Sequence, residues 1–342
     1  MAEQHGRIPV MADVARLAGV SHQTVSRVLN DHPNVRAETR ERVLAAIGEL
    51  GYRRNSSARA LVTRRTGVIG VVAFATTHYG PARTLTGIEH AARAAGYFVS
   101  VVTLNEVTRQ EVRGAMEHLA RQAVEGYVVI APKRAVIEAM PEWAGGAPVV
   151  AVEGGEAPDL PVVCVDQRGG AHQATRHLLE LGHRTVAHIA GPRDWLEAEE
   201  RVAGWRQALE EAGAPAAEPH HGDWRPRSGY EIGRALAAGG ALPSAVFVAN
   251  DQMALGVLRA LAERGLRVPE DVGVVGFDDV PEAEFYSPPL TTVAQDFTEV
   301  GERAIRVLVD LLEQGGGAAE RPVREVVHAH MVVRSSCGAA RR

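Results

Sequence analysis

Apolar residues recur with helical spacing in two short stretches near the start of the chain. The apolar positions are Val14, Leu17 and Ala18 in the first stretch, and Val25, Val28 and Leu29 in the second. Between the stretches, Gly19 suits a helix end that needs positive φ, and Ser21 suits the N-cap of a following helix. The pattern predicts two short helices joined by a tight turn. A third helix is predicted over residues 37–50, with Val43, Leu44, Ile47 and Leu50 facing the core.

From Thr66 onward, short apolar runs alternate with stretches of helical spacing. The predicted strands are Ile69–Phe74, Val99–Leu104, Gly126–Ile130, Val149–Glu153, Val162–Val165, Val186–Ala190, Ala245–Ala249, Val272–Phe277, Thr291–Ala294 and Val326–Val333. Helices expected between them include Thr84–Ala95, Gly169–Leu181, Arg201–Ala212, Gln252–Arg264 and Thr298–Glu313. This alternation predicts an α/β fold with two successive doubly wound parallel-sheet halves, and ligands of such sheets bind at the carboxyl ends of the strands. The last two strands follow the completed second half, so we expect them to cross back.

Charge separates the predicted helical headpiece from the rest of the chain. Residues 1–65 hold 11 Arg against 6 Asp and Glu, which leaves 26 basic and 36 acidic residues for the remainder. A basic headpiece on an acidic body suits a protein that contacts phosphate at one end. Cys164 and Cys337 are the two cysteines, and their spacing gives neither a metal site nor a disulfide framework. The cysteine pattern fits a reducing cytoplasm. We expect no cofactor, and we expect the protein to be associated with the nucleoid.

The second predicted helix carries a polar face that begins at its N-terminus. His22, Gln23, Ser26 and Arg27 lie opposite its apolar positions. Gln pairs bidentately with adenine and Arg with guanine in a major groove, as in a helix-turn-helix. On spacing alone, the alternative is a three-helix core with a solvated polar face.

Several motifs together resemble the LacI/GalR family of bacterial transcriptional repressors, from about residue 9 to about residue 334. The motifs are Ala12-Asp-Val-Ala, Gly19-Val-Ser-His-Gln-Thr-Val-Ser-Arg-Val-Leu-Asn30, Leu181-Gly-His-Arg, Ala190-Gly-Pro192, Arg201-Val-Ala-Gly-Trp205, Gly222-Asp-Trp224, Ala249-Asn-Asp-Gln-Met-Ala-Leu-Gly256, Val275-Gly-Phe-Asp-Asp279, Pro288-Pro-Leu-Thr-Thr292 and Gln295-Asp-Phe297. The resemblance implies a periplasmic-binding-protein-like core of two subdomains behind the headpiece. It also implies a homodimer on a pseudo-palindromic, double-stranded DNA operator.

The resemblance assigns residues to the DNA contact. His22, Gln23 and Arg27 occupy the base-reading positions, while the expected phosphate contacts are Ser21, Thr24, Ser26 and Asn30. Composition alone favours a plain linker for residues 55–62, whereas the family folds this segment, which starts at Asn55, into a hinge helix on DNA. Leu61 matches the residue that wedges into the minor groove, where two such wedges kink the central step.

The resemblance also assigns an effector site between the two core halves. Its expected contacts are His78, Tyr79, Pro81, Glu153, Glu197, Arg201, Trp224, Asn250, Asp278, Gln295 and Phe297. Carboxylates, amides and an arginine can hold vicinal hydroxyls of a sugar, and an aromatic face suits its C–H side. Before the family is considered, a structural role competes in several places: Asn250 as a helix N-cap, Asp278 as a loop cap and Trp224 as a core residue. Arg201 could also pair with Glu199 or Glu200 on an exposed helix face.

The expected effector is a neutral glycoside such as a galactoside. Another family member has Asp at the position of Glu153, and a more apolar stretch at the position of His78-Tyr79-Gly80-Pro81. Both positions are expected to face the variable end of the sugar, so the effector of this chain should differ there. A purine or a phosphorylated sugar acting as co-repressor is the alternative, although Asp278 and Glu153 would repel a phosphate. Effector binding should close the cleft and separate the hinge helices, which lowers operator affinity.

The expected domains are a headpiece at 1–54, a hinge at 55–65, a core at 66–335 and a tail at 336–342. We expect the first subdomain over 66–165 and 296–325, and the second over 166–295 and 326–335. The chain lacks a leucine heptad near residue 342, so we expect a dimer. A periplasmic solute-binding protein is an alternative, but no signal peptide or membrane span is recognisable. An enzyme is disfavoured because Gly-x-Ser-x-Gly, His-Glu-x-x-His and phosphate-loop motifs are missing.

Overall fold

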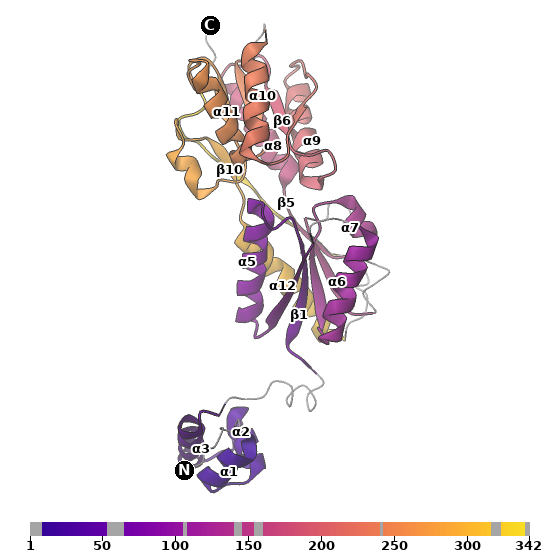
Figure 1. The fold of residues 1–342 in the computed structure, drawn as a ribbon, viewed down its shortest axis with the longest axis vertical. Coiled ribbons are helices and arrows are strands. Elements are labelled where there is room, and N and C mark those ends of the chain that lie inside the picture. The colour runs from indigo at the N-terminus through magenta and orange to yellow at the C-terminus, as the bar shows by residue number, and fades with distance from the viewer. Residues whose placement is uncertain are drawn as a thin grey trace, which may run out of the picture. The chain divides into compact units, whose positions relative to one another are not determined.

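The chain forms two compact units, Met1–Thr66 and Gly67–Arg342, in the computed structural model shown in Figure 1. The structure describes residues 9–52, 65–104, 108–139, 146–153, 160–239, 242–315 and 323–338. The predicted hinge at 55–62, with Asn55 and Leu61, therefore lies outside the described residues. Within the described part, no helix is both long and apolar enough to cross a membrane.

The N-terminal unit is a three-helix headpiece of α1 (Met11–Ala18), α2 (His22–Leu29) and α3 (Ala37–Leu50). Its buried core consists of Val14, Ala15, Ala18, Val25, Val28, Val43, Ala46 and Tyr52. Two predicted core positions are wrong, because Leu17 is 45% exposed and Leu44 is 53% exposed. On these short helices Ala15 and Ala46 face the core instead, since small residues let the helices approach closely.

The first subdomain of the core unit is a parallel sheet of six strands in the order β11-β5-β4-β3-β1-β2. Its strands are β1 (Val68–Phe74), β2 (Phe98–Leu104), β3 (Gly126–Ile130), β4 (Val149–Val152), β5 (Val162–Val165) and β11 (Arg324–Val327). Its helices are α5 (Tyr79–Ala94), α6 (Arg109–Arg121), α7 (Arg134–Ala139) and α12 (Phe297–Glu313). Strands β3, β4 and β5 are buried along their whole length, because helices cover both faces of the parallel sheet.

The second subdomain is a parallel sheet of four strands in the order β7-β6-β8-β9. The strands are β6 (Ala187–Ala190), β7 (His220–His221), β8 (Ala245–Val248) and β9 (Gly273–Val275). The helices are α8 (Gln167–Glu180), α9 (Leu196–Glu211), α10 (Pro226–Ala238) and α11 (Asp251–Glu263), followed by a 3-10 helix, η2 (Pro281–Phe285). Figure 1 shows α8 to α11 gathered in one half of the core unit, and α5, α6, α7 and α12 in the other.

The chain passes between the subdomains three times: from β5 into α8, from β10 (Thr292–Ala294) into α12, and from β11 into β12 (His330–Val332). The prediction of one strand over Val326–Val333 is wrong. Strand β11 pairs with β5 in the first subdomain, whereas β12 pairs antiparallel with β10 beside the second. Residues His328 and Ala329 separate them, because the chain changes sheets at this point.

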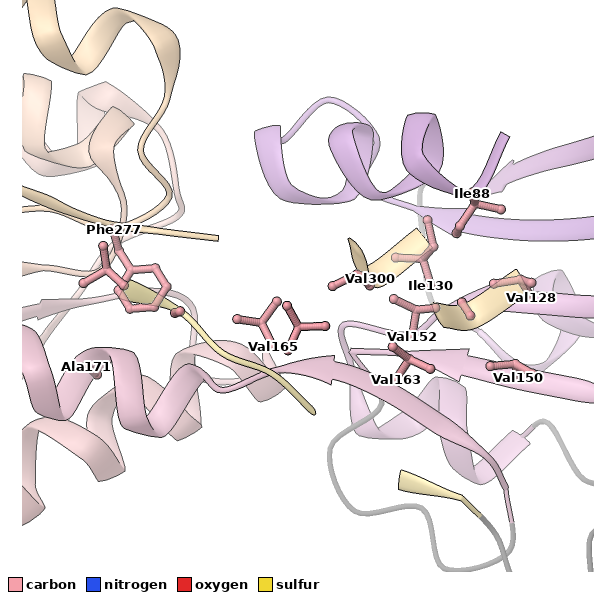
Figure 2. Close-up of a cluster of buried hydrophobic side chains, with 14 of the residues drawn as sticks. Ile88, Val128, Ile130, Val150, Val152, Val163, Val165, Ala171, Phe277 and Val300 are labelled. Carbon is pink, nitrogen blue, oxygen red and sulfur yellow. The ribbon is translucent and has the colours of Figure 1, made fainter. Parts of the chain in front are cut away.

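A continuous cluster of buried apolar side chains joins the two subdomains along these crossings. In Figure 2, valines and isoleucines of the first subdomain lead to Val165, and Phe277 and Ala171 of the second subdomain lie on its other side. Helices α5 and α12 meet through Gly87 and Gly301, since a methyl group added at Gly301 would lie 2.3 Å from the Gly87 backbone. This close contact fixes the start of α12, and with it Phe297, against α5.

Candidate functional sites: a helix-turn-helix face and a polar cavity

The first candidate site is the polar face of α2. Gly19 ends α1 with φ 64°, and the Ser21 hydroxyl caps α2 by accepting the Thr24 N–H at 3.1 Å. His22, Gln23 and Arg27 are exposed on α2, whereas Val25 and Val28 are buried. This geometry leaves the side chains of the first helical turn at the surface, as an element that reads base edges requires.

The remaining predicted DNA-contact residues flank this face. Ser21 and Asn30 are exposed, and Thr24 and Ser26 are half-buried. The hydroxyls of Ser21 and Thr24 lie 2.9 Å apart. Arg40 on α3 donates to the carbonyl oxygen of His32 at 3.1 Å, which fixes the turn that follows α2. The helix therefore stands on a supported scaffold, with hydroxyl and amide groups at both of its ends.

The second candidate site is a cavity of the core unit that is partly open to solvent, with about 500 Å³ of empty space including the solvent at its mouth. It is lined by all eleven residues that the family resemblance assigned to the effector site: His78, Tyr79, Pro81, Glu153, Glu197, Arg201, Trp224, Asn250, Asp278, Gln295 and Phe297. Five further residues line it that the sequence reasoning missed, namely Gly80, Thr84, Ile130, Gln167 and Trp195.

The lining residues come from the carboxyl ends of strands in both subdomains. Glu153 follows β4, Asn250 follows β8 and Asp278 follows β9. Two helices begin five residues earlier than predicted, α5 at Tyr79 and α9 at Leu196. The first turn of α5 tolerates Pro81, because the first N–H groups of a helix have no hydrogen-bond partner within it. The first turn of α9 contains Glu197 and Glu199, whose negative charge is favoured near a helix N-terminus.

Arg201 is the buried centre of the polar network. Its Nε donates to Gln167 Oε1 at 2.8 Å, its Nη1 donates to the carbonyl oxygen of Ala249, and its Nη2 lies 3.5 Å from Asp278 Oδ1. The guanidinium carbon lies 3.9 Å from the ring centroid of Phe277. Arg201 is only 5% exposed.

The alternative that Arg201 pairs with its helical neighbours on a solvated face is therefore wrong. Glu199 pairs with Arg134 instead, and Glu200 pairs with Arg168. The helix face that carries Arg201 points into the protein, so its guanidinium is desolvated and held by fixed acceptors.

Asn250 and Trp224 both have the structural role that was the alternative to effector contact, and both also line the cavity. Asn250 does cap α11, since its Oδ1 accepts the Met253 N–H at 3.0 Å, and its Nδ2 donates to the carbonyl oxygen of Trp224 at 3.1 Å. Trp224 is 6% exposed and also lines the cavity. A methyl group at Gly191 would lie 2.2 Å from the Trp224 ring, so this glycine makes room for the indole.

Three cavity residues adopt positive φ although they are not glycine: Glu153 at 61°, Trp224 at 71° and Asp278 at 110°. Such conformations cost about 1–3 kcal/mol each and persist where the surroundings enforce them. Asp278 is held by the Nε2 of Gln295, which donates to its Oδ1 at 2.6 Å. Three of the seven non-glycine residues with positive φ in the described part of the chain thus line this cavity, and backbone strain of this kind often occurs at functional sites.

Three buried polar atoms of the wall have no hydrogen-bond partner among the described residues: Glu153 Oε1, Glu197 Oε2 and Trp224 Nε1. Leaving such groups unpaired costs roughly 1–3 kcal/mol each. Two carboxylate acceptors and one indole donor therefore remain for a bound molecule, which would need hydrogen-bond donors as well as an acceptor.

Burial shifts the pKa values of these acids. Desolvation raises the pKa of Glu153 to about 7, against the opposing effects of Gln167 and Arg201. It raises the pKa of Asp278 to about 6, again against Arg201, and it raises the pKa of Glu197 well above its ordinary value, with the Glu153 charge acting in the same direction. The desolvation that disfavours the charged forms of these three acids would equally disfavour the charge of an anionic ligand, for which Arg201 is the one nearby guanidinium in the described cavity wall.

Two of the residues that were not predicted, Gln167 and Trp195, also lie near the carboxyl ends of strands. Gln167 is the first residue of α8 and follows β5 by two residues, and Trp195 lies between β6 and α9, so both come shortly after the end of a strand. The strand pattern could have indicated them. Only the fold, however, brings Gln167 beside Arg201, which lies 34 positions further along the chain.

Comparisons with known proteins agree with both sites. Residues 10–55 match the profile of the bacterial regulatory proteins of the lacI family, and residues 175–337 match the periplasmic binding protein-like domain. The chain is 39% identical to the HTH-type transcriptional regulator CelR of Thermobifida fusca, covering 96% of this chain and 98% of that protein. It is 34% identical to the lactose operon repressor of Escherichia coli (strain K12), covering 87% and 83% of the two chains.

Solved structures agree over almost the whole length. The Lac repressor dimer bound to operator and the anti-inducer ONPF matches with a TM-score of 0.87 and 33% identity, covering 97% of this chain and 100% of that one. A transcriptional regulator CelR-cellobiose complex matches with a TM-score of 0.72 and 35% identity, covering 96% and 99%. With its helix-turn-helix, its two-subdomain core and these relatives, the chain belongs to the LacI family: it is a DNA-binding transcriptional repressor under effector control, and not an enzyme.

Proposed function

We propose that this repressor binds a pseudo-palindromic operator as a homodimer, and that a neutral glycoside in the core cavity lowers its affinity for that operator. On the DNA side, His22, Gln23 and Arg27 would contact base edges, since they are the exposed side chains at the start and middle of α2. Ser21, Thr24, Ser26 and Asn30 would hold phosphates from the two ends of the helix.

The observation that carries the effector proposal is the set of buried atoms without hydrogen-bond partners in the described wall of an acidic and aromatic cavity. Glu153 Oε1 and Glu197 Oε2 call for hydroxyl donors, and Trp224 Nε1 calls for an acceptor. A sugar hydroxyl supplies both functions. Tyr79 and Phe297, whose ring centroids lie 5.9 Å apart, offer apolar surface to the C–H side of a sugar ring.

The charge of the cavity favours a neutral sugar over a phosphorylated one. Arg201 is the cation among the lining residues, and its donors already bind Gln167, Ala249 and Asp278. A phosphate would have to displace these contacts and approach three carboxyl groups. Among neutral sugars, the CelR–cellobiose complex supports a β-glucoside, and the similarity to the lactose operon repressor supports a galactoside.

A thermal-shift screen of the purified full-length protein tests the proposal. The panel would contain cellobiose, lactose, glucose, galactose, adenine, guanine and glucose 6-phosphate. A ligand at about 100 times its Kd stabilises the folded state by about 2.7 kcal/mol, which gives an easily measured rise in melting temperature. We expect a neutral glycoside to shift the melt, and Asp278→Ala to abolish the shift. A shift produced only by a purine or by the phosphate ester would contradict the proposal.

A further inference from the structure

The turn that presents Asp278 to the cavity is held by contacts from two other segments of the chain. It connects β9 to η2, and both Asp278 and the next residue, Asp279, have positive φ, at 110° and 50°. Neither residue is glycine, so each conformation is unfavourable by itself and persists only where the surrounding contacts enforce it. The conformation of this turn therefore depends on residues that lie elsewhere in the sequence.

Asp251, the first residue of α11, fixes the ends of the turn. Its backbone N–H donates to the carbonyl oxygen of Phe277 at 2.9 Å, and its Oδ2 accepts the N–H of Val280 at 2.9 Å. Its Oδ1 accepts the hydroxyl of Thr292 on β10 at 2.6 Å. Asp251 is fully buried, so water does not compete for these bonds. They hold the residues immediately before and after the pair Asp278–Asp279.

Arg334 holds the middle of the turn. It lies two residues after β12, and its Nη2 lies 2.8 Å from Asp279 Oδ1. Its Nη1 donates to the carbonyl oxygen of Leu290 at 2.9 Å, and its backbone N–H donates to the hydroxyl oxygen of Thr291, also at 2.9 Å. Because a guanidinium carries several donors in one plane, a single side chain ties Asp279 to the segment that leads into β10.

The turn and β10 together place the carboxylate of Asp278. The backbone N–H of Asp278 donates to the carbonyl oxygen of Val293 on β10 at 2.8 Å, and β10 leads directly to Gln295, whose Nε2 donates to Asp278 Oδ1. If Asp279 relaxed to negative φ, the backbone before it would rotate and carry the Asp278 carboxylate away from Gln295 and Arg201. The ion pair between Arg334 and Asp279 opposes this relaxation.

We propose that Arg334 is a positioning residue for the effector: its ion pair with Asp279 holds Asp278 in the conformation that binds the hydroxyl groups of the ligand. This inference rests on the proposed glycoside-binding function. Arg334 acts through the turn, since Asp278 is the residue of this group that lines the cavity.

Hydrogen exchange of the full-length, ligand-free protein tests the turn without any sugar. In Arg334→Ala, we expect the peptide that contains Asp278 and Val280 to exchange at least about tenfold faster than in wild type, because both N–H groups are hydrogen-bonded in the held turn. The matched control is Arg259→Ala, which removes an ion pair of the same 2.8 Å length with Glu263 on the exposed face of α11. The control should leave the exchange of this peptide unchanged.

Isothermal titration of cellobiose and lactose into the full-length variants tests the effect on binding. Asp279→Ala and Asp279→Gly both lose the ion pair, but glycine adopts positive φ without strain and alanine does not. We expect Arg334→Ala and Asp279→Ala to raise the Kd of the bound sugar at least about fivefold, and Asp279→Gly to stay within about twofold of wild type. An ion pair with a merely structural role would not distinguish alanine from glycine. The melting temperature of each variant establishes that it is folded under the titration conditions.

The results separate this inference from the proposed function. Unchanged exchange in Arg334→Ala would show that the turn does not depend on Arg334. Equal sugar Kd values for wild type and Arg334→Ala, or for Asp279→Ala and Asp279→Gly, would refute the positioning role while the glycoside function stands. If the wild-type protein binds none of the neutral glycosides, the proposed function fails and this inference fails with it.

Discussion

The side-chain amide of Gln167 donates to Gln295 Oε1 at 2.9 Å, and this bond joins two of the three passages between the subdomains. Gln167 follows β5 on the first passage, and Gln295 follows β10 on the second. The same Gln167 nitrogen lies 3.3 Å from Glu153 Oε2, and its oxygen accepts from Arg201. The passages that set the angle between the subdomains are therefore part of the cavity wall.

Replacing Gln167 should weaken effector binding through this network. Gln167→Leu keeps the approximate volume but leaves the Arg201 Nε–H and Gln295 Oε1 without their partner. The loss of a bond to a charged group, about 1.5 kcal/mol, should raise the effector Kd about tenfold in isothermal titration. Gln207→Leu on the exposed face of α9 is the matched control and should leave the Kd unchanged. Equal Kd values for the two variants would mean that the network does not support binding.

The stability of the ligand-free protein should depend on pH through Glu153. Burial raises the pKa of this carboxyl from 4.5 in the unfolded chain to about 7 in the folded one. Below pH 4.5 Glu153 is protonated in both states, so the free energy of unfolding is not reduced by this residue. As the pH rises to 7 and above, the unfolded chain loses the proton more readily than the folded one, and the free energy of unfolding falls by about 3 kcal/mol in total. Glu153→Gln cannot ionise, so its melting temperature should exceed that of wild type by an amount that grows between these two pH values. A constant difference across this range would contradict the assignment.

The helix contact that positions Phe297 should not tolerate a methyl group. Gly301→Ala would bring a Cβ within 2.3 Å of the Gly87 backbone, so we expect a loss of stability of at least about 1–3 kcal/mol and weaker effector binding. Gly114→Ala is the control, since a Cβ in the middle of α6 meets no atom within 4 Å. The control should raise stability by about 0.5–1 kcal/mol, because alanine favours helix. Thermal unfolding of both variants decides the matter, and a neutral Gly301→Ala would disprove the tight crossing.

The DNA-reading role of α2 is tested by Gln23→Ala. A good bidentate contact to a base contributes about 1–3 kcal/mol, so affinity for a DNA duplex selected by the wild-type protein from a random pool should fall roughly 5- to 150-fold. Affinity for unrelated duplex DNA should change little, because that binding depends on phosphates. Arg16→Ala, on the exposed end of α1, provides a control for charge near the DNA. Equal losses on selected and unrelated DNA would refute base reading by Gln23.

The sequence predicted those features of the architecture that a local pattern determines. Predictions were wrong for features that depend on the tertiary arrangement. Alternating strands and helices predicted a ligand site at strand ends, which is where Asn250 and Asp278 lie, whereas the individual cavity residues were assigned by the motif resemblance. Helical spacing could not distinguish the core face from its edge, which is why Leu17 and Leu44 are exposed. Nor could it show that Val326 and Met331 lie in different sheets, since sheet membership depends on partners far away in the chain.

The burial of Arg201 shows the same limit. Its neighbours Glu199 and Glu200 made a surface ion pair plausible, and hydrophobic periodicity says little about a helix whose charged residue faces a cavity. The alignment of α9 against α8 decides the question, because it brings Gln167 to the guanidinium. Motif resemblance located this residue in the cleft, whereas spacing alone did not.

The measurement that tests the central claim most directly is fluorescence anisotropy of a labelled operator duplex, titrated with wild-type and Asp278→Asn proteins with and without the glycoside identified by the thermal-shift screen. Asp278 contacts Arg201 and Gln295 at the cavity, and the variant keeps its shape while removing its charge. We predict that the glycoside weakens operator binding by wild type, and that Asp278→Asn binds the operator equally well with and without the glycoside. If the glycoside releases both proteins from DNA at the same concentration, the cavity is not the site through which the effector acts.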